Sequence, residues 1–235
     1  MKGKMDPKKL FIDERLLGYC VYCGDKPTTR DHVPSKVLLD EPYPNDLPVV
    51  PACKKCNNDF SKDELYLACF IECVITGSTD PSSIQRVKIR RILERNPTLS
   101  ARILTSQITN SDGNLLWFPE EQRIRNIVLK LARGHAAYEL NEPQLDEPEH
   151  LNFMPILYMT KEQFELFNTP LVESGYPEIG SRKFCQLFVT DNQIINSSSW
   201  EVIQQGRYKY LVSYSGQIIV RMVLSEYLAC EVIWR

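Results

Sequence analysis

The chain has 235 residues and a mass of 27.2 kDa, with 43% hydrophobic and 25% charged residues, which is enough to bury a core in one domain or two small ones. No segment reaches the roughly 20 consecutive apolar residues of a membrane span, and the four lysines of residues 1–10 precede no apolar run typical of a signal peptide, so we expect a cytoplasmic protein without membrane contact. The formal net charge of -2 excludes a globally basic nucleic-acid-binding protein, so a nucleic-acid function would have to depend on local charge.

Residues 18–75 predict a compact unit in which two cysteine pairs flank two short strands. Apolar residues recur at three- and four-residue steps in its last part, which predicts a helix. Asn57, Asn58 or Asp59 could cap the start of this helix, and Gly77 suits its end. In chain order the expected elements are a strand near 28–33, a proline-rich loop at 34–48, a second strand near 48–51 and the helix from about 57 to 75.

The middle of the chain predicts helices with uneven charge. Residues 82–95 predict a basic helix that ends at Asn96 and Pro97, and residues 120–140 predict a second helix because apolar residues keep helical spacing there. The segment 83–104 carries a net charge of +5, and residues 139–150 carry a net charge of -5. Within the latter, 141–150 is rich in proline and acid and has no periodicity, so we expect a linker there.

Beyond this linker the pattern changes to short strands, with one helix near 161–167. Tight turns at Gln205-Gly206 and Ser215-Gly216 join the middle strands, which predicts an antiparallel meander. The role of this part is open between choosing the substrate, forming a dimer and binding a partner. The predicted strands are 184–190, 199–204, 207–214, 217–225 and 227–234.

Four of the eight cysteines form two Cys-x-x-Cys pairs. Four thiolates from two turns are the ligand set of a closed, tetrahedral structural zinc site, and the glycine after the first pair suits a tight turn. A redox-active pair needs a thioredoxin-like setting that this sequence lacks, so we expect structural Zn²⁺ and not a redox or disulfide pair. The expected zinc ligands are Cys20, Cys23, Cys53 and Cys56, while Cys69, Cys73, Cys185 and Cys230 are expected to be core thiols.

A candidate active site lies between and just after these pairs. Asp31 and His32 end the first predicted strand, and Asn57 directly follows the last cysteine of the second pair. In this order the sequence resembles the HNH nucleases of the ββα-metal superfamily, in the subgroup whose finger is closed by four cysteines. The resemblance covers roughly residues 18–65. It implies a ββα fold and metal-dependent hydrolysis of DNA phosphodiester bonds, with 5′-phosphate and 3′-hydroxyl ends.

The residue types at these positions suit that chemistry. The unperturbed pKa of imidazole lies near neutral pH, so His32 fits the general base that activates a water molecule. Negative charge that accumulates on the phosphate needs a divalent cation, and a hard ion such as Mg²⁺ prefers oxygen ligands. Asp31 and the side-chain carbonyl of Asn57 fit as its protein ligands, and Asn58 or Asp59 could replace or supplement Asn57.

The chain departs from the family at one position, and each residue also has an ordinary interpretation. The family usually has an asparagine in the second strand that clamps the active-site loop; this chain has Pro48 there, and its nearest candidate is Asn45, so the middle position stays unassigned. An Asp-His pair is often a surface pair, and an asparagine after a knuckle is often a helix cap. His135, on an apolar helix stripe, and His150, in the linker, are expected to have no catalytic role.

Local positive charge predicts where nucleic acid would bind. Arginine and lysine contacts to phosphates supply affinity that does not depend on base sequence, although the basic helix could equally present a solvated face. The predicted nucleic-acid-binding residues are Arg30 and Lys36 near the candidate active site, Lys54 and Lys55 between the second pair of cysteines, and Arg86, Arg90 and Arg91 of the basic helix, with Lys88 and Arg95 as its further cations.

We therefore expect an α+β protein whose main function is that of a metal-dependent DNA endonuclease, with structural Zn²⁺ and catalytic Mg²⁺ or another divalent ion. The alternatives are a non-catalytic zinc-dependent module that binds nucleic acid or a protein partner, and an RNA-directed nuclease. A homo-oligomer or partner contact through the C-terminal part is also open. The expected domains are a ββα zinc-knuckle nuclease module at 1–80, a helical connector at 81–140, the acidic linker at 141–150 and a C-terminal antiparallel sheet domain at 151–235.

Overall fold

The computed structural model describes residues 18–169, 177–187 and 200–235, so the N-terminal lysines lie outside the described residues. The chain forms two compact units. One combines Met1–Asn58 with Val128–Arg235, and the other is Asp59–Ile127. The fold is mixed α and β, as expected. Among the described helices, none has both the length and the apolar character needed to cross a membrane.

The first unit contains two short strands, β1 (Thr29–His32) and β2 (Val49–Ala52), with the 3-10 turn η3 (Lys36–Leu38) between them. The strands pair antiparallel, with His32 opposite Val49. The next element, α1 (Lys54–Thr76), starts directly after Cys53. The predicted start near 57 is therefore wrong, because Asn57, Asn58 and Asp59 lie inside the helix. Its predicted end is confirmed, since Gly77 has a positive φ of 72°.

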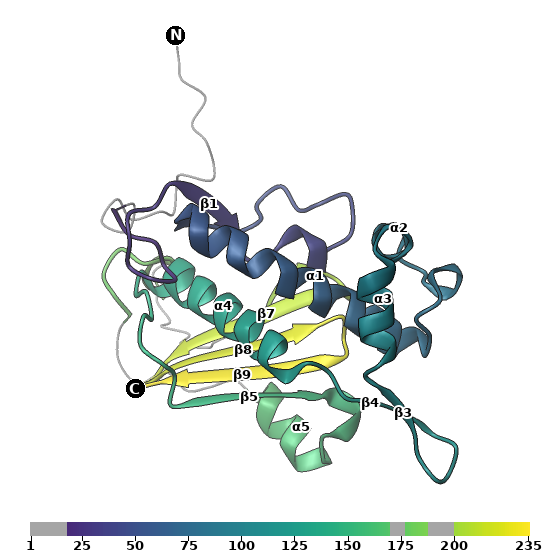
Figure 1. The fold of residues 1–235 in the computed structure, drawn as a ribbon. Helices are drawn as coiled ribbons and strands as arrows, with labels where there is room; N and C mark the ends of the chain where they lie inside the picture. The colour runs from purple at the N-terminus through teal and green to yellow at the C-terminus, as the bar shows by residue number, and fades with distance from the viewer. Residues whose placement is uncertain (1–17, 170–176, 188–199) are drawn as a thin grey trace. The chain divides into compact units, whose positions relative to one another are not determined.

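A five-stranded antiparallel sheet forms most of the C-terminal part, as expected (Figure 1). The predicted turns are confirmed at Gly206 and Gly216, which both have positive φ. The edge strand β5 was not predicted, because the sequence shows an acidic linker where it starts. The strands are β5 (His150–Pro155), β6 (Glu201–Gln204), β7 (Tyr208–Tyr214), β8 (Ile218–Leu224) and β9 (Leu228–Trp234), in the order β5-β9-β8-β7-β6.

One face of this sheet packs against the part of α4 (Glu121–Leu140) that belongs to the same unit. Tyr210 lies on this face opposite Met222 of β8. The ring of His135 stacks on Tyr210, with the ring centroids 3.7 Å apart, and Figure 1 shows this part of α4 running along the sheet. His135 is therefore a core residue whose ring is enclosed by the sheet.

The opposite face carries Arg221, because neighbouring residues of a strand point to opposite sides. The 3-10 turn η5 (Ile156–Tyr158) and the helix α5 (Lys161–Asn168) cover part of this face. Thr160 and Gln163 form a reciprocal capping box at the start of α5. Phe167 packs there with Val223 and Ala229.

One predicted strand is wrong. Residues 184–187 of the expected strand 184–190 belong to a short helix, α6 (Arg182–Leu187), and residues 188–190 lie outside the described residues, as does Ser199 at the start of the next predicted strand. Cys185 of α6 is exposed, so it is no core thiol. Cys69, Cys73 and Cys230 are buried as predicted.

The second unit contains the basic segment. The predicted helix 82–95 is split into a 3-10 turn, η4 (Pro81–Ser83), and α2 (Val87–Arg95). Asn96 ends α2 as predicted, and its side chain then caps the next helix by accepting a hydrogen bond from Leu99 N at 3.1 Å. This helix and a small hairpin were not predicted. They are α3 (Pro97–Leu104), β3 (Gln107–Thr109) and β4 (Leu115–Trp117).

Candidate metal centre and active site

The four predicted zinc ligands come together. The sulfur atoms of Cys20, Cys23, Cys53 and Cys56 all lie within 4.8 Å of one another. Gly24 has a φ of 79° and its N–H donates to the carbonyl of Cys20 at 2.8 Å, which closes the first turn. This cluster could hold a structural metal such as zinc, because soft thiolates in a tetrahedral set are its preferred ligands.

The cysteines differ in acidity before any ion binds. Desolvation raises the pKa of the Cys23 thiol to about 11. The backbone N–H of Cys56 donates to the sulfur of Cys53 at 3.3 Å and lowers the pKa of that thiol. A cation in the cluster would favour all the thiolates and would displace their protons. Metal binding at this cluster should therefore weaken as the pH falls.

Asp31, in strand β1, is buried and is held by contacts with two other side chains. Its residue is 8% exposed. The hydroxyl of Tyr22 donates to Asp31 Oδ2 at 3.0 Å, and Lys130 Nζ lies 2.7 Å from the same oxygen. Neither contact uses Oδ1, and no hydrogen bond to Oδ1 comes from another described residue. The carboxylate thus keeps one oxygen for a further ligand.

Lys130 was not predicted to belong to the site. It lies on α4, and its side chain is fully buried. Besides the ion pair with Asp31, its ammonium donates to Ser35 Oγ at 3.2 Å. The only signal in the sequence is a lysine three residues after Ile127 of the apolar stripe. Sequence reasoning treats such a lysine as solvated, because a charge inside a core needs a partner that periodicity does not reveal.

Asn57 is tied to β1 from the first turn of α1. Its Nδ2 donates to Thr29 Oγ1 at 3.3 Å and to the carbonyl of Arg30 at 3.4 Å. Because the nitrogen end of the amide faces the strand, the carbonyl end is left for another ligand. His32 ends the same strand and is half-buried. The strand and the helix turn therefore bring Asn57 beside the strand that carries Asp31 and His32.

The loop between β1 and β2 is held from two sides. Val33 N donates to the carbonyl of Pro48 at 3.0 Å. On the other side, Gln204 of β6 exchanges two hydrogen bonds with the backbone of Asp40, one from Asp40 N to Gln204 Oε1 at 2.8 Å and one from Gln204 Nε2 to Asp40 O at 2.9 Å. Arg207 also pairs with the Asp40 carboxylate at 2.5 Å. Asn45 is exposed. The C-terminal sheet thus anchors the loop that follows Asp31 and His32.

The predicted nucleic-acid-binding residues have different surroundings. The side chains of Arg30, Lys36, Lys54 and Lys55, all in the first unit, are exposed. In the second unit, Arg86 is almost fully buried and pairs with Glu72 at 3.3 Å, which argues against the phosphate contact predicted for it. Arg90 is half-buried, and its guanidinium donates twice to the carbonyl of Ile84, at 3.0 and 2.8 Å. Arg91 and Arg95 are exposed.

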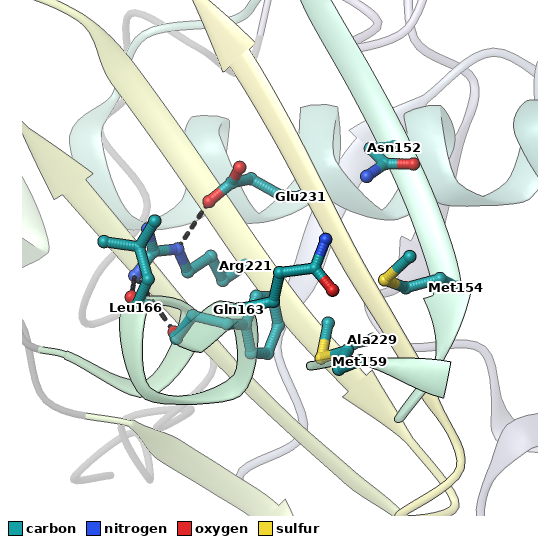
Figure 2. A pocket seen from close by; sticks show the side chains of 9 residues that line it. Asn152, Met154, Met159, Gln163, Leu166, Arg221, Ala229 and Glu231 are labelled. Carbon is teal, nitrogen blue, oxygen red and sulfur yellow. Dashed lines mark hydrogen bonds and ion pairs between the residues drawn. The ribbon is translucent and has the colours of Figure 1, made fainter. Parts of the chain in front are cut away.

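A separate cavity of about 150 Å³ lies between α5 and the sheet (Figure 2). Arg221 and Glu231 form part of its wall and are joined by an ion pair of 2.6 Å. The same guanidinium donates to the carbonyls of Leu166, Phe167 and Thr169. Among the described residues, no other lysine or arginine lines this cavity. The guanidinium of Arg221 is already bound to Glu231 and to carbonyls at the end of α5, so the cavity is a poor candidate for binding a phosphate group.

Comparisons with known protein families, with curated proteins and with solved structures found no match.

Proposed function

We propose that this protein is a metal-dependent endonuclease of the HNH type that hydrolyses DNA phosphodiester bonds, with structural Zn²⁺ in the cysteine cluster. One observation carries the proposal. A histidine and an aspartate end β1, an asparagine in the first turn of α1 hydrogen-bonds to that strand, and four clustered cysteines flank both elements. A binding module needs the cysteine cluster, but it has no need for this arrangement of base and oxygen ligands.

His32 would act as the general base. A neutral imidazole accepts a proton near neutral pH, so it can take the proton of the water that attacks the phosphorus. His32 would not bind either metal ion. Its neighbour Asp31 points to the buried side of the strand, as alternation along a strand requires.

Asp31 and Asn57 would hold the catalytic divalent ion. Asp31 has Oδ1 left after its contacts with Tyr22 and Lys130, and Asn57 has its carbonyl oxygen left after its amide nitrogen binds β1. Two oxygen donors suit Mg²⁺ or Mn²⁺, which keep several waters in protein sites. When bound, such an ion would offset the negative charge that develops on the phosphate.

Gln204 offers a counterpart to the middle asparagine of the family. That asparagine clamps the active-site loop, and the chain has Pro48 in its place. Gln204 forms paired hydrogen bonds with the backbone of Asp40 in the same loop. We therefore assign the clamping role to an amide from the C-terminal sheet, which gives that part of the chain a function in the site.

The second candidate is a non-catalytic zinc-dependent module that binds nucleic acid or a protein. The observation that favours it is the ion pair of Asp31 with the buried Lys130, because a structural role alone would explain a buried aspartate. The two candidates differ in what His32 does. In the binding module, His32 could be replaced without loss of any chemical step.

The test is cleavage of plasmid DNA and of RNA by the purified chain, with and without Mg²⁺ or Mn²⁺. We expect DNA cleavage that needs the ion and that His32→Ala lowers by about 10²- to 10⁴-fold, the usual value of a general base. Zinc content, thermal stability and DNA binding of the variant should match those of the parent. Preferred cleavage of RNA would select the RNA-directed nuclease, and a wild-type rate for His32→Ala would refute the mechanism. No cleavage under any ion would select the binding module.

A further inference from the structure

The charge of Asp31 is already offset inside the protein. Lys130 Nζ lies 2.7 Å from Asp31 Oδ2 and has no exposed side-chain surface. A buried ion pair is screened little by water or salt, so each charge strongly affects any third charge nearby. An incoming cation at Oδ1 would therefore meet a carboxylate paired with an ammonium group.

The remaining ligands do not make up for this loss of charge. Asn57 contributes a neutral carbonyl, and His32 is neutral when it acts as a base. The exposed charged side chains nearest in sequence to this pair and to Asn57 are three cations, Arg30, Lys54 and Lys55, and one acid, Asp59. The cations outnumber the acid, so together these side chains disfavour a divalent cation and favour a phosphate. A divalent ion would thus bind the free protein weakly, while a bound phosphodiester would bring further negative charge to Asp31 and Asn57.

We propose that Lys130 makes binding of the divalent ion depend on the nucleic acid: it neutralises Asp31 in the free protein, and the bound phosphodiester then supplies the charge that retains the ion at Asp31 and Asn57. This inference rests on the proposed nuclease function. It gives Lys130 a positioning and charge-setting role that does not require contact with the substrate. It also means that the free protein holds the divalent ion only weakly.

The probe is Mn²⁺, whose free form is measured by electron paramagnetic resonance in a titration of the full, zinc-loaded chain. A His32→Ala background slows cleavage of the short DNA duplex that is added. We expect Mn²⁺ to bind at least about tenfold more tightly with the duplex than without it. A methylphosphonate duplex of the same sequence, which lacks the phosphate charge, should give no such gain.

The decisive variant is Lys130→Met in the same background. Removing the ammonium should strengthen Mn²⁺ binding to the DNA-free protein by about tenfold or more and reduce the gain from the duplex. Simple damage to the site would weaken Mn²⁺ binding. The direction of the change in Mn²⁺ affinity therefore separates the removal of a repelling charge from damage to the site. Lys130→Arg keeps the charge and should behave like the parent. Tyr22→Phe removes a hydrogen bond from the same oxygen without a change of charge, and it should change Mn²⁺ affinity by less than about twofold.

Zinc content and circular dichroism would establish that each variant is folded. If Lys130→Met does not fold, the Mn²⁺ titrations of the His32→Ala protein with and without duplex still test the proposal. Equal Mn²⁺ affinity with and without the duplex would overturn it. Unchanged or weaker Mn²⁺ binding by folded Lys130→Met would overturn it as well. Cleavage by the wild type that needs His32, together with DNA-independent ion binding, would sink only this inference. An inactive wild type would instead sink the nuclease function.

Discussion

Single residues in this chain have roles that their type alone does not reveal. Lys130 is a buried charge beside Asp31, and Arg86 is a buried partner of Glu72. Charged residues are placed in a core only when a partner offsets the desolvation of the charge. His135 is the neutral counterpart, since its Nε2 lies 2.8 Å from the hydroxyl of Tyr208 in the core. The effect of replacing each of these residues on stability should therefore depend on the partner that is left behind.

His135 should make the fold sensitive to acid. Its burial lowers its pKa from 6.5 to about 3, so between these values the unfolded chain binds a proton that the folded chain does not. Stability is therefore lost as the pH falls through 6.5 toward 3, by about 2 kcal/mol at pH 5. His135→Gln stays neutral and can still hydrogen-bond to Tyr208, so it should lose about 2 kcal/mol less than the parent between pH 7.5 and 5. Urea unfolding at both pH values measures this difference. Equal losses of unfolding free energy in the parent and in His135→Gln would show that His135 is not the group responsible.

The elements of the first unit meet around α4. Its part within this unit contacts β1 and the following loop through Lys130 and contacts the five-stranded sheet through His135. Gly134 lies between these two residues, and a Cβ at this position would approach a methyl carbon of Val33 to 2.6 Å. A side chain here would therefore press on the residue that follows His32. The helix thus connects the candidate site to the sheet by direct packing.

Gly134→Ala should reveal this packing. Alanine gains about 1 kcal/mol in a helix relative to glycine, but overpacking a core typically costs about 1–3 kcal/mol. We expect a net loss of about 1 kcal/mol, measured by denaturant unfolding. In a Val33→Ala background the methyl groups are gone, so the same change should become neutral or stabilising. The double-mutant cycle tests this coupling. Equal costs in both backgrounds would mean that α4 shifts away without strain.

The structure shows which arginines of the basic helix α2 are suited to a charge-reversal test of DNA binding. Reversing Arg90 would break its two hydrogen bonds to Ile84, whereas Arg91 and Arg95 are exposed. Arg91→Glu with Arg95→Glu should weaken DNA binding for all sequences and lower the salt slope by about one to two, because phosphate contacts release counterions. Stability should change by less than about 0.5 kcal/mol. The exposed Lys161 of α5 provides a charge-reversal control, and an unchanged slope would identify α2 as a solvated face.

At the scale of the whole molecule, sequence-distant segments form one compact unit. Residues 1–58 combine with 128–235, while residues 59–127 form another unit. The domain boundaries expected at 80, 140 and 150 remain a prediction. Residues 141–149 contain no helix or strand, yet the carbonyl of Asp146 accepts hydrogen bonds from Trp234 Nε1 and from Arg133. This segment is therefore a packed connection within the unit, and its backbone groups are partly satisfied by the sheet and by α4.

Removal of a metal ion held by the cysteine cluster should destabilise this unit as a whole. We expect about one zinc ion per folded chain, released together with about four titratable thiols, because the folded cluster and the ion stabilise each other. Cys20→Ser should lower unfolding stability by more than about 2 kcal/mol, against less than about 0.5 kcal/mol for the exposed Cys185→Ser. Elemental analysis and calorimetry measure both. A folded preparation without zinc would contradict the assignment of the cluster.

The sequence by itself determined the features that depend on local spacing. The cysteine pairs with Gly24 predicted a metal-binding cluster, and alternation with glycine turns predicted four of the five strands of the C-terminal sheet. The helix ends at Gly77 and Asn96 were also predicted, because a positive φ favours glycine and a proline disfavours helical backbone at the residue before it.

Only the tertiary structure decided which distant groups meet. The ion pair of Lys130 with Asp31 joins residues far apart in the chain, and so do the hydrogen bonds of Gln204 with Asp40. A strand and a short helix also compete closely where local preferences are weak, which is why the predicted strand at 184–187 is a helix. Periodicity shows which face of an element is apolar. The partner of a buried charge depends on how the elements pack, and the local spacing of residues does not determine this packing.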